Sequence, residues 1–270
     1  MSLQEGTCSL EWLYTVLIRL STLQHHVRFD MCSGFVTSTN ETCQTGSAES
    51  HRVDADLSRT TESDLRMEML SRDMSNIKIS ITNGSHVVYE MLRETNIEIL
   101  NLRTTDDLLL AATTIPTLTN LKELHIWGTY IVRGECMLTP SIELISLQNG
   151  TWSSEWLYSV LIRLSNIQHH VCFEVCNCLV VSNNETYQSD LEGCVMRSEI
   201  FAAVIADFAD DSKTRNTILR SEMSIDMSNI ELGIMNGSSV LYDMLRNSSI
   251  GILNLRSTHN LALAQQFYKL

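Results

Sequence analysis

The chain has 270 residues, 44% of them hydrophobic, and a formal net charge of −13. This charge disfavours a nucleic-acid-binding protein, because phosphates need a basic surface, and it indicates solubility more than a particular partner. No apolar run approaches the ~20 residues that span a bilayer, and the N-terminus lacks the basic segment and apolar run of a secretory signal, so we expect neither.

The cysteines and the glycosylation sequons point to different compartments. Eight cysteines occur, but they do not recur in a regular pattern in the two repeats of the chain. A disulfide-stapled extracellular repeat usually shows a regular pattern, so we expect reduced thiols in a cytoplasmic protein. Sequons are typical of secreted surfaces, although asparagine at such places also suits a turn, which is the interpretation we favour. The sequons start at Asn40, Asn83, Asn149, Asn184, Asn236 and Asn247.

The first recurring stretch lies near the N-terminus. Residues 11–27 contain EWLY and end in QHHV, and both phrases return in residues 155–171, a shift of 144. Trp12 and Trp156 hold equivalent helical positions in these stretches, and we expect both to pack in the core or on the helical side.

A polar insertion follows this stretch in each half, at about residues 33–74 and 177–228. We expect these insertions to be part loop and part helix, with a helix at residues 199–208, and we expect residues 33–62 and 177–226 to be more mobile than the regular units.

Residues 75–105 predict a strand–turn–helix–strand unit. Two segments of alternating apolar residues, 77–81 and 97–102, flank a segment at 87–92 whose apolar residues recur at helical spacing. Asn83-Gly84 predicts the turn and Ser85 the helix N-cap. The same phrase returns in residues 229–258.

Hexapeptides of the form L-x-x-L-x-L occur at residues 97–102, 121–126, 142–147 and 250–255. This pattern resembles the leucine-rich repeat family, whose period is 20 to 29 residues. The predicted strand markers are Val27, Ile79, Leu100, Leu124, Ile145, Val171, Leu232 and Leu253, with gaps of 21, 24, 21 and 26 residues from Ile79 to Val171.

The resemblance implies an α/β fold, a curved solenoid with a parallel concave sheet and convex helices. We expect one domain of two tandem super-repeats, residues 1–141 and 142–270, and, because neither end shows a capping repeat, a segment of a longer array. The predicted core-facing strand residues are Leu100, Leu102, Leu124, Ile126, Ile145 and Leu147.

One family feature is displaced in this sequence. The family usually places Asn or Cys three residues after the last strand leucine, where the side chain holds the loop backbone. Here Asn83, Asn149 and Asn236 come one residue earlier, so we expect the asparagine ladder to be absent or shifted. The usual places hold Thr105, Thr129, Gly150 and Thr258.

The resemblance implies a non-enzymatic module that binds a protein ligand on its concave face, with no nucleic acid and no membrane as partner. The helices resemble those of intracellular, ribonuclease-inhibitor-like arrays, so we expect a ligand-sensing segment of an immune-receptor-like protein; the alternative is a substrate adaptor of a ubiquitin-ligase complex. Two outward rows are predicted, Ser80, Asn101, His125, Ser146 and Cys172, and Thr82, Arg103, Trp127, Gln148 and Glu174.

The predicted partner-binding residues belong to these rows. We expect Arg103 and Trp127 to dominate, because Arg and Trp are frequent hot-spot residues; the alternative for Trp127 is burial under the loop that follows it. The full set is Asn101, Arg103, His125, Trp127, Ser146, Gln148 and Glu174.

Catalytic and cofactor motifs are missing from the sequence. It has no nucleophile elbow, Walker loop or G-x-G-x-x-G, so we expect neither an enzyme nor a cofactor. His169-His170 with Cys172, Cys176 and Cys178 meets only part of a zinc spacing, and the equivalent His25-His26 has fewer cysteines, so we favour strand residues at a repeat edge over a metal site.

Overall fold

The computed structural model describes residues 2–4, 7–32, 35–37, 62–130, 137–181, 225–246 and 248–257. These residues form two compact units. Unit 1 comprises Met1–Trp127 with Met137–Ile142, and unit 2 comprises Gly128–Cys136 with Glu143–Leu270. Every strand pair whose register is defined is parallel, so the predicted α/β class with a parallel sheet is confirmed.

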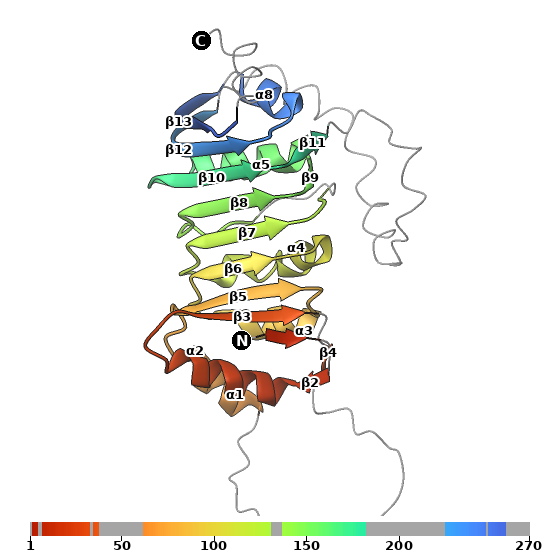
Figure 1. Cartoon of the computed structure of the whole chain (residues 1–270). Coiled ribbons are helices and arrows are strands. Elements are labelled where there is room, and N and C mark those ends of the chain that lie inside the picture. Colours follow the sequence, from red (N-terminus) through yellow and green to blue (C-terminus); the bar gives the residue numbers. More distant parts are fainter. Residues whose placement is uncertain are drawn as a thin grey trace, which may run out of the picture. The chain divides into compact units, whose positions relative to one another are not determined.

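Unit 1 is built on a sheet whose strands run in the order β1-β3-β5-β6-β7. Helices α3 and α4 lie behind this sheet (Figure 1), and the short strands β2 and β4 pair separately. The strands are β1 (Ser2–Gln4), β2 (Thr7–Ser9), β3 (Val27–Cys32), β4 (Phe35–Thr37), β5 (Ile77–Thr82), β6 (Ile99–Leu102) and β7 (Glu123–Trp127). The helices are α1 (Leu10–Ser21), α2 (Glu62–Leu70), α3 (His86–Leu92), α4 (Thr105–Ala111) and the 3-10 helix η1 (Ile115–Thr117).

Unit 2 has the strand order β8-β10-β12-β13, with helices α5 and α8 behind the sheet (Figure 1). Strands β9 and β11 form a separate pair. The strands are β8 (Leu144–Gln148), β9 (Thr151–Ser153), β10 (Val171–Cys176), β11 (Leu179–Val181), β12 (Asp226–Met235) and β13 (Ser249–Leu255), and the helices are α5 (Ser154–Ser165) and α8 (Ser239–Leu245).

The core of each unit lies between its sheet and its helices. Because successive strand side chains point to opposite faces, the apolar residues of each hexapeptide share the helical side. Each contributes about 1.5–3 kcal/mol when fully buried. Leu100, Leu102, Leu124, Ile126, Ile145 and Leu147 are all 1% exposed or less, which confirms the predicted core-facing set.

Serine holds the N-cap position of three helices, of which only Ser85 was predicted. Ser9 and Ser153 precede α1 and α5, and their hydroxyls accept hydrogen bonds from the backbone N–H groups of Trp12 and Trp156 at 3.2 and 3.1 Å. Ser85 holds the N-cap position of α3, yet its side chain makes no cap bond, and its Oγ is buried without a hydrogen-bond partner. The predicted position is therefore right and the capping interaction is missing.

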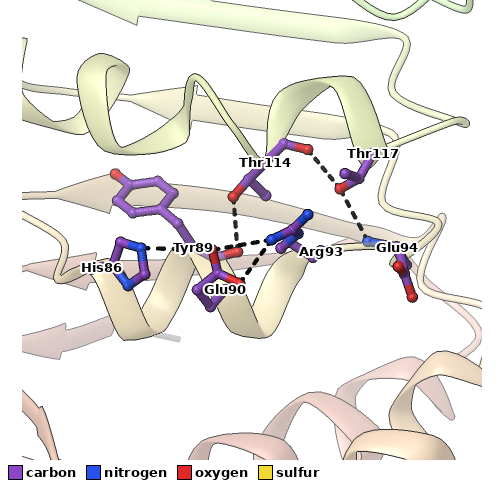
Figure 2. Close-up of polar contacts among 7 residues, drawn as sticks. All are labelled: His86, Tyr89, Glu90, Arg93, Glu94, Thr114 and Thr117. Carbon is purple, nitrogen blue, oxygen red and sulfur yellow. Dashed lines mark hydrogen bonds and ion pairs between the residues drawn. The ribbon is translucent and has the colours of Figure 1, made fainter.

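Threonine hydroxyls join α3 to the next helical segment (Figure 2). The Oγ1 atom of Thr114 donates to the carbonyl of Tyr89 at 3.1 Å. The Oγ1 atom of Thr117 donates to the carbonyl of Thr114 at 2.7 Å and accepts from the backbone N–H of Glu94 at 3.2 Å. These bonds satisfy backbone groups at the end of a short helix, which would otherwise lack partners.

The outer surface of α3 carries a row of ionisable side chains (Figure 2). His86 Nε2 lies 3.6 Å from Glu90 Oε1, and Arg93 Nη1 lies 3.2 Å from Glu90 Oε2. Exposed pairs of this kind contribute little to stability. The outer surface of α3 therefore carries charges that are paired within the helix.

Two predicted strand markers need correction. The register pairs Phe29 with Ile79 and Phe173 with Ile145, so the markers Val27 and Val171 lie two residues too early. Strands β3 and β10 carry an additional apolar position at their start, on the same face. An alternation of period two determines the sheet face on which a residue lies but not its register with the neighbouring strand.

The described ends of the insertions contain a helix, as predicted, and short strands that were not predicted. Strands β4 and β11 and helix α2 lie inside the predicted insertion ranges. Met69 and Met74, near the end of the first range, are 0% exposed and belong to the core of unit 1. The predicted helix at residues 199–208 lies outside the described residues, as do the sequon asparagines Asn40 and Asn184.

Asparagines form the turns after four strands. Asn83, Asn149, Asn177 and Asn236 have φ of 53, 49, 54 and 56°, the left-handed region that asparagine tolerates better than most residues. In unit 2, Asn177 Nδ2 donates to Asn149 Oδ1 at 3.1 Å and Asn236 Nδ2 donates to Asn177 Oδ1 at 2.7 Å. An asparagine ladder is therefore present and shifted; Asn177, which no glycine follows, was not predicted.

Candidate protein-binding face

The predicted site residues divide between the two units. Asn101, Arg103, His125 and Trp127 belong to unit 1, whereas Ser146, Gln148 and Glu174 belong to unit 2. In each unit they alternate with core residues and lie on the sheet face away from the helices, which we call the open face.

The open face of unit 1 holds an aromatic and cationic cluster. The Cζ atom of Arg103 lies 5.1 Å from the ring centroid of Trp127. The ring of His125 stacks on that of Trp127, two residues further along the same strand, with centroids 6.0 Å apart and planes 27° apart. We call Arg103, His125 and Trp127 the Arg103 cluster. The predicted meeting of Arg103 and Trp127 in one patch is therefore confirmed.

The members of this cluster differ in accessibility. Arg103 is exposed and Trp127 is half-buried. The side chain of His125 is only 14% exposed, and its Nε2 lies 3.1 Å from Glu123 Oε2. His125 therefore supports the indole, whereas Arg103 and one part of Trp127 offer contact area.

Two predicted contact residues are buried. Asn101 is 1% exposed, and its Nδ2 donates to Ser80 Oγ at 3.0 Å and to the carbonyl of Ile79 at 3.3 Å. Ser146 is 0% exposed. Both lie on the predicted face, but polar neighbours cover them, so their contribution is to position other side chains.

An ion pair fixes the charge balance beside the Arg103 cluster. Arg28 Nε donates to Asp30 Oδ1 at 2.8 Å. Burial alone would raise the pKa of Asp30, but hydrogen bonds from Arg28 and Ser80, with the charges of Arg28 and Arg103, outweigh burial and lower it. Asp30 is therefore ionised near neutral pH and already has a cationic partner.

The open face of unit 2 is a closed hydrogen-bond network. Gln148 Nε2 donates to Ser146 Oγ at 2.9 Å, and Ser146 Oγ donates to Glu174 Oε2 at 3.4 Å. Glu174 Oε1 accepts from Arg256 Nη2 at 2.7 Å. This pairing was not predicted, because the two residues belong to strands that are not adjacent in the sheet.

The predicted rows are also displaced at β10. The register pairs Glu174 with Ser146 and Cys176 with Gln148, and Cys172 with Leu144. Cys172 was predicted beside Ser146 and Glu174 beside Gln148, so both assignments are wrong by one pair. The cause is the misplaced marker of this strand.

The histidine pairs lie outside the strands, and Cys178 is buried. His25, His26, His169 and His170 are exposed and precede β3 and β10. The prediction that they are strand residues is therefore wrong. Cys178 is 3% exposed and its Sγ accepts from Trp152 Nε1 at 3.3 Å; burial raises the pKa of its thiol. Within the described ranges, no three His, Cys, Asp or Glu side chains gather in a metal-binding arrangement.

Comparisons of the chain with family models, with curated proteins and with solved structures found no match. Of the helices that the structure describes, none combines the length and the apolar character needed to cross a membrane.

Proposed function

We propose that this chain is a non-enzymatic protein-interaction module of the leucine-rich-repeat type, which binds a protein partner through the open face of unit 1. The observation that carries the proposal is the Arg103 cluster, in which an exposed guanidinium lies over a half-buried indole. The alternation of parallel strands and helices, together with the L-x-x-L-x-L hexapeptides, supports the repeat type.

The chemistry of this cluster suits a protein partner. Trp and Arg are enriched among hot-spot residues because they combine apolar area, hydrogen-bond donors and charge. The indole is held by His125 and the guanidinium rests on the indole, so little side-chain freedom remains to be lost on binding. A rigid contact of this kind gives affinity without a catalytic group.

We place the module in the cytoplasm as a ligand-sensing segment. Cys8, Cys32, Cys172, Cys176 and Cys178 are free thiols, as expected for a reducing compartment. The sequon residues Asn83, Asn149 and Asn236 are exposed and have positive φ in turns, which supports the turn interpretation.

Site-specific photo-crosslinking tests the proposal. A photoreactive phenylalanine replaces Thr82, at the end of β5 on the open face, or His86, whose side chain is 67% exposed on the outer surface of α3. In cells that express the protein, we expect one protein to crosslink from position 82 and not from position 86. The partner is then identified by mass spectrometry and purified.

Affinity for this purified partner is the deciding measurement. Trp127→Ala should weaken binding by about 2 kcal/mol or more, roughly 30-fold, while the melting temperature stays close to that of the wild type. Equal crosslinking from both faces, or unchanged affinity of a folded Trp127→Ala variant, would contradict the proposal.

A further inference from the structure

Arg103 in unit 1 and Arg256 in unit 2 hold the same place in the recurring phrase NLR, yet only one has an anionic hydrogen-bond partner. Arg256 Nη2 donates to Glu174 Oε1 at 2.7 Å. The guanidinium of Arg103 makes no hydrogen bond to a side chain of the described residues; its contact is the face of Trp127. Its N–H donors are therefore available to a ligand.

The residue on the intervening strand explains this difference. In unit 2 that residue is Gly233, and a Cβ atom built there would lie 3.6 Å from Glu174 Cγ and 3.7 Å from Arg256 Nη2. These are ordinary van der Waals distances for a methyl group, so the arginine crosses the strand directly over Gly233, and a side chain larger than a methyl group would enter its path. In unit 1 the register places Ser80 there, between Asp30 and Asn101.

The acidic residue of the row differs as well. Unit 2 has Glu174, whereas unit 1 has the shorter Asp30, which Arg28 holds at 2.8 Å. Position 172, the counterpart of Arg28 in unit 2, is a cysteine, so Glu174 has no such competitor. Arg103 therefore faces a carboxylate that is both shorter and already paired.

The remaining charges of the unit 1 open face leave an excess of cations. Asp30 is matched by Arg28, and Glu123 lies beside His125. Lys78, on β5, forms no ion pair within the described part of the chain. In a chain of net charge −13, this face thus carries three cationic side chains, Arg28, Lys78 and Arg103, against the two carboxylates of Asp30 and Glu123.

We propose that the Arg103 cluster binds the carboxylate side chains of an acidic segment in a protein partner, an inference that rests on the proposed function. The planar guanidinium can donate two parallel N–H bonds to one carboxylate, and the indole beneath it fixes the plane of the fork. A phosphate dianion suits this site less, because Asp30 and Glu123 belong to the same face. Lys78 provides a second, weaker contact along the acidic segment.

A defined peptide tests the inference without the natural partner. The probe is a fluorescein-labelled octapeptide of alternating glutamate and serine with an amidated C-terminus, and its matched control has glutamine in place of glutamate. Binding to the full chain is measured by fluorescence anisotropy at low and at physiological salt. We expect saturable binding of the glutamate peptide, weakened by salt, and about tenfold weaker binding of the glutamine peptide.

Variants assign the binding to the cluster. Arg103→Gln should weaken binding of the glutamate peptide by about tenfold or more, Lys78→Gln by about threefold, and Arg256→Gln should leave it unchanged because that arginine is occupied by Glu174. Circular dichroism and thermal unfolding check that each variant is folded.

The outcomes separate this inference from the proposed function. Equal binding of the glutamate and glutamine peptides, an equal loss in Arg256→Gln, or tighter binding of a phosphoserine peptide would overturn the carboxylate assignment. If Trp127→Ala nevertheless weakens binding of the purified protein partner, the proposed function stands and only the ligand chemistry is wrong. Failure of both experiments would remove the proposed function as well.

Discussion

The two units contain the same tryptophan at the same helical position and bury it to different extents. Trp156 in α5 is 2% exposed, whereas Trp12 in α1 is 39% exposed. Trp156 stacks on Trp152 at 4.9 Å and meets the edge of Tyr130 at 5.1 Å. The counterpart of Trp152 in unit 1 is Cys8, which offers no ring. A repeated residue therefore acquires its environment from neighbours that are not repeated: of the two predicted packing residues, Trp156 lies in the core, whereas Trp12 lies on α1 and is exposed.

A second difference concerns the turn that precedes each short helix. In unit 1 the carboxylate of Asp107, 0% exposed, accepts from the backbone N–H groups of Asn83 and Gly84 at 3.1 and 2.7 Å. It also accepts from the hydroxyl of Tyr89 at 2.8 Å and from Thr104 N and Oγ1 at 3.1 and 2.6 Å. The corresponding position in the second phrase is an asparagine, residue 260.

The largest difference between the units is expected from the tryptophans. Trp156→Ala should destabilise unit 2 by about 3–5 kcal/mol, because it removes a fully packed aromatic side chain. Trp12→Ala should cost about 1 kcal/mol or less in unit 1. Denaturant unfolding monitored by hydrogen exchange gives the unfolding free energy of each unit separately. Equal costs in the two variants would show that the stacking with Trp152 and Tyr130 contributes nothing.

The next effect concerns the buried carboxylate of unit 1. Asp107→Asn replaces one acceptor oxygen by an N–H₂ donor that faces other donors, so we expect a loss of about 2–3 kcal/mol in unfolding free energy. Asp106→Asn is the matched control, since it removes an exposed carboxylate from the same helical turn and the same helix dipole. If the midpoint of chemical denaturation falls equally in both variants, Asp107 stabilises the fold only through its interaction with the helix dipole.

Acid should affect unit 1 through Asp30. Its pKa is lowered in the folded protein, so its stabilisation is complete above the unfolded pKa of about 3.9 and is lost as the pH falls through the folded pKa. The stability advantage of the wild type over Asp30→Asn should therefore shrink between about pH 5 and about pH 3. A constant difference across this range, measured by urea unfolding, would mean that Asp30 is not stabilised by Arg28 and Ser80.

The smallest effect tests why Arg256 is occupied and Arg103 is not. In the wild type, a double-mutant cycle of Arg256→Gln and Glu174→Gln should give a coupling energy of about 0.5 kcal/mol. Gly233→Ser introduces a side chain where unit 1 has Ser80, so in that background the coupling should approach zero. Unchanged coupling in Gly233→Ser would show that glycine at this position is not what permits the ion pair.

Much of the local structure could be predicted from the sequence. Alternating apolar residues predicted the strands and their buried faces, as in Leu100 and Leu102, and Ser85 marked the start of α3. The register was harder, because the alternation in β3 and β10 is equally regular two residues further along. The candidate site shows the same limit: Arg103 and Trp127 were brought together as predicted, whereas the partner of Glu174 was not found.

The sequence by itself determined the parallel α/β class, the core face of the strands and the column that holds Arg103 and Trp127, because side-chain periods of two and 3.6 residues are local properties. Only the tertiary structure decided which side chains remain available. Burial of Asn101 and Ser146, occupation of Arg256 and exposure of Trp12 depend on residues from other strands and on the space that Gly233 and Cys8 leave. Such contacts join residues far apart in the chain, and no local pattern records them.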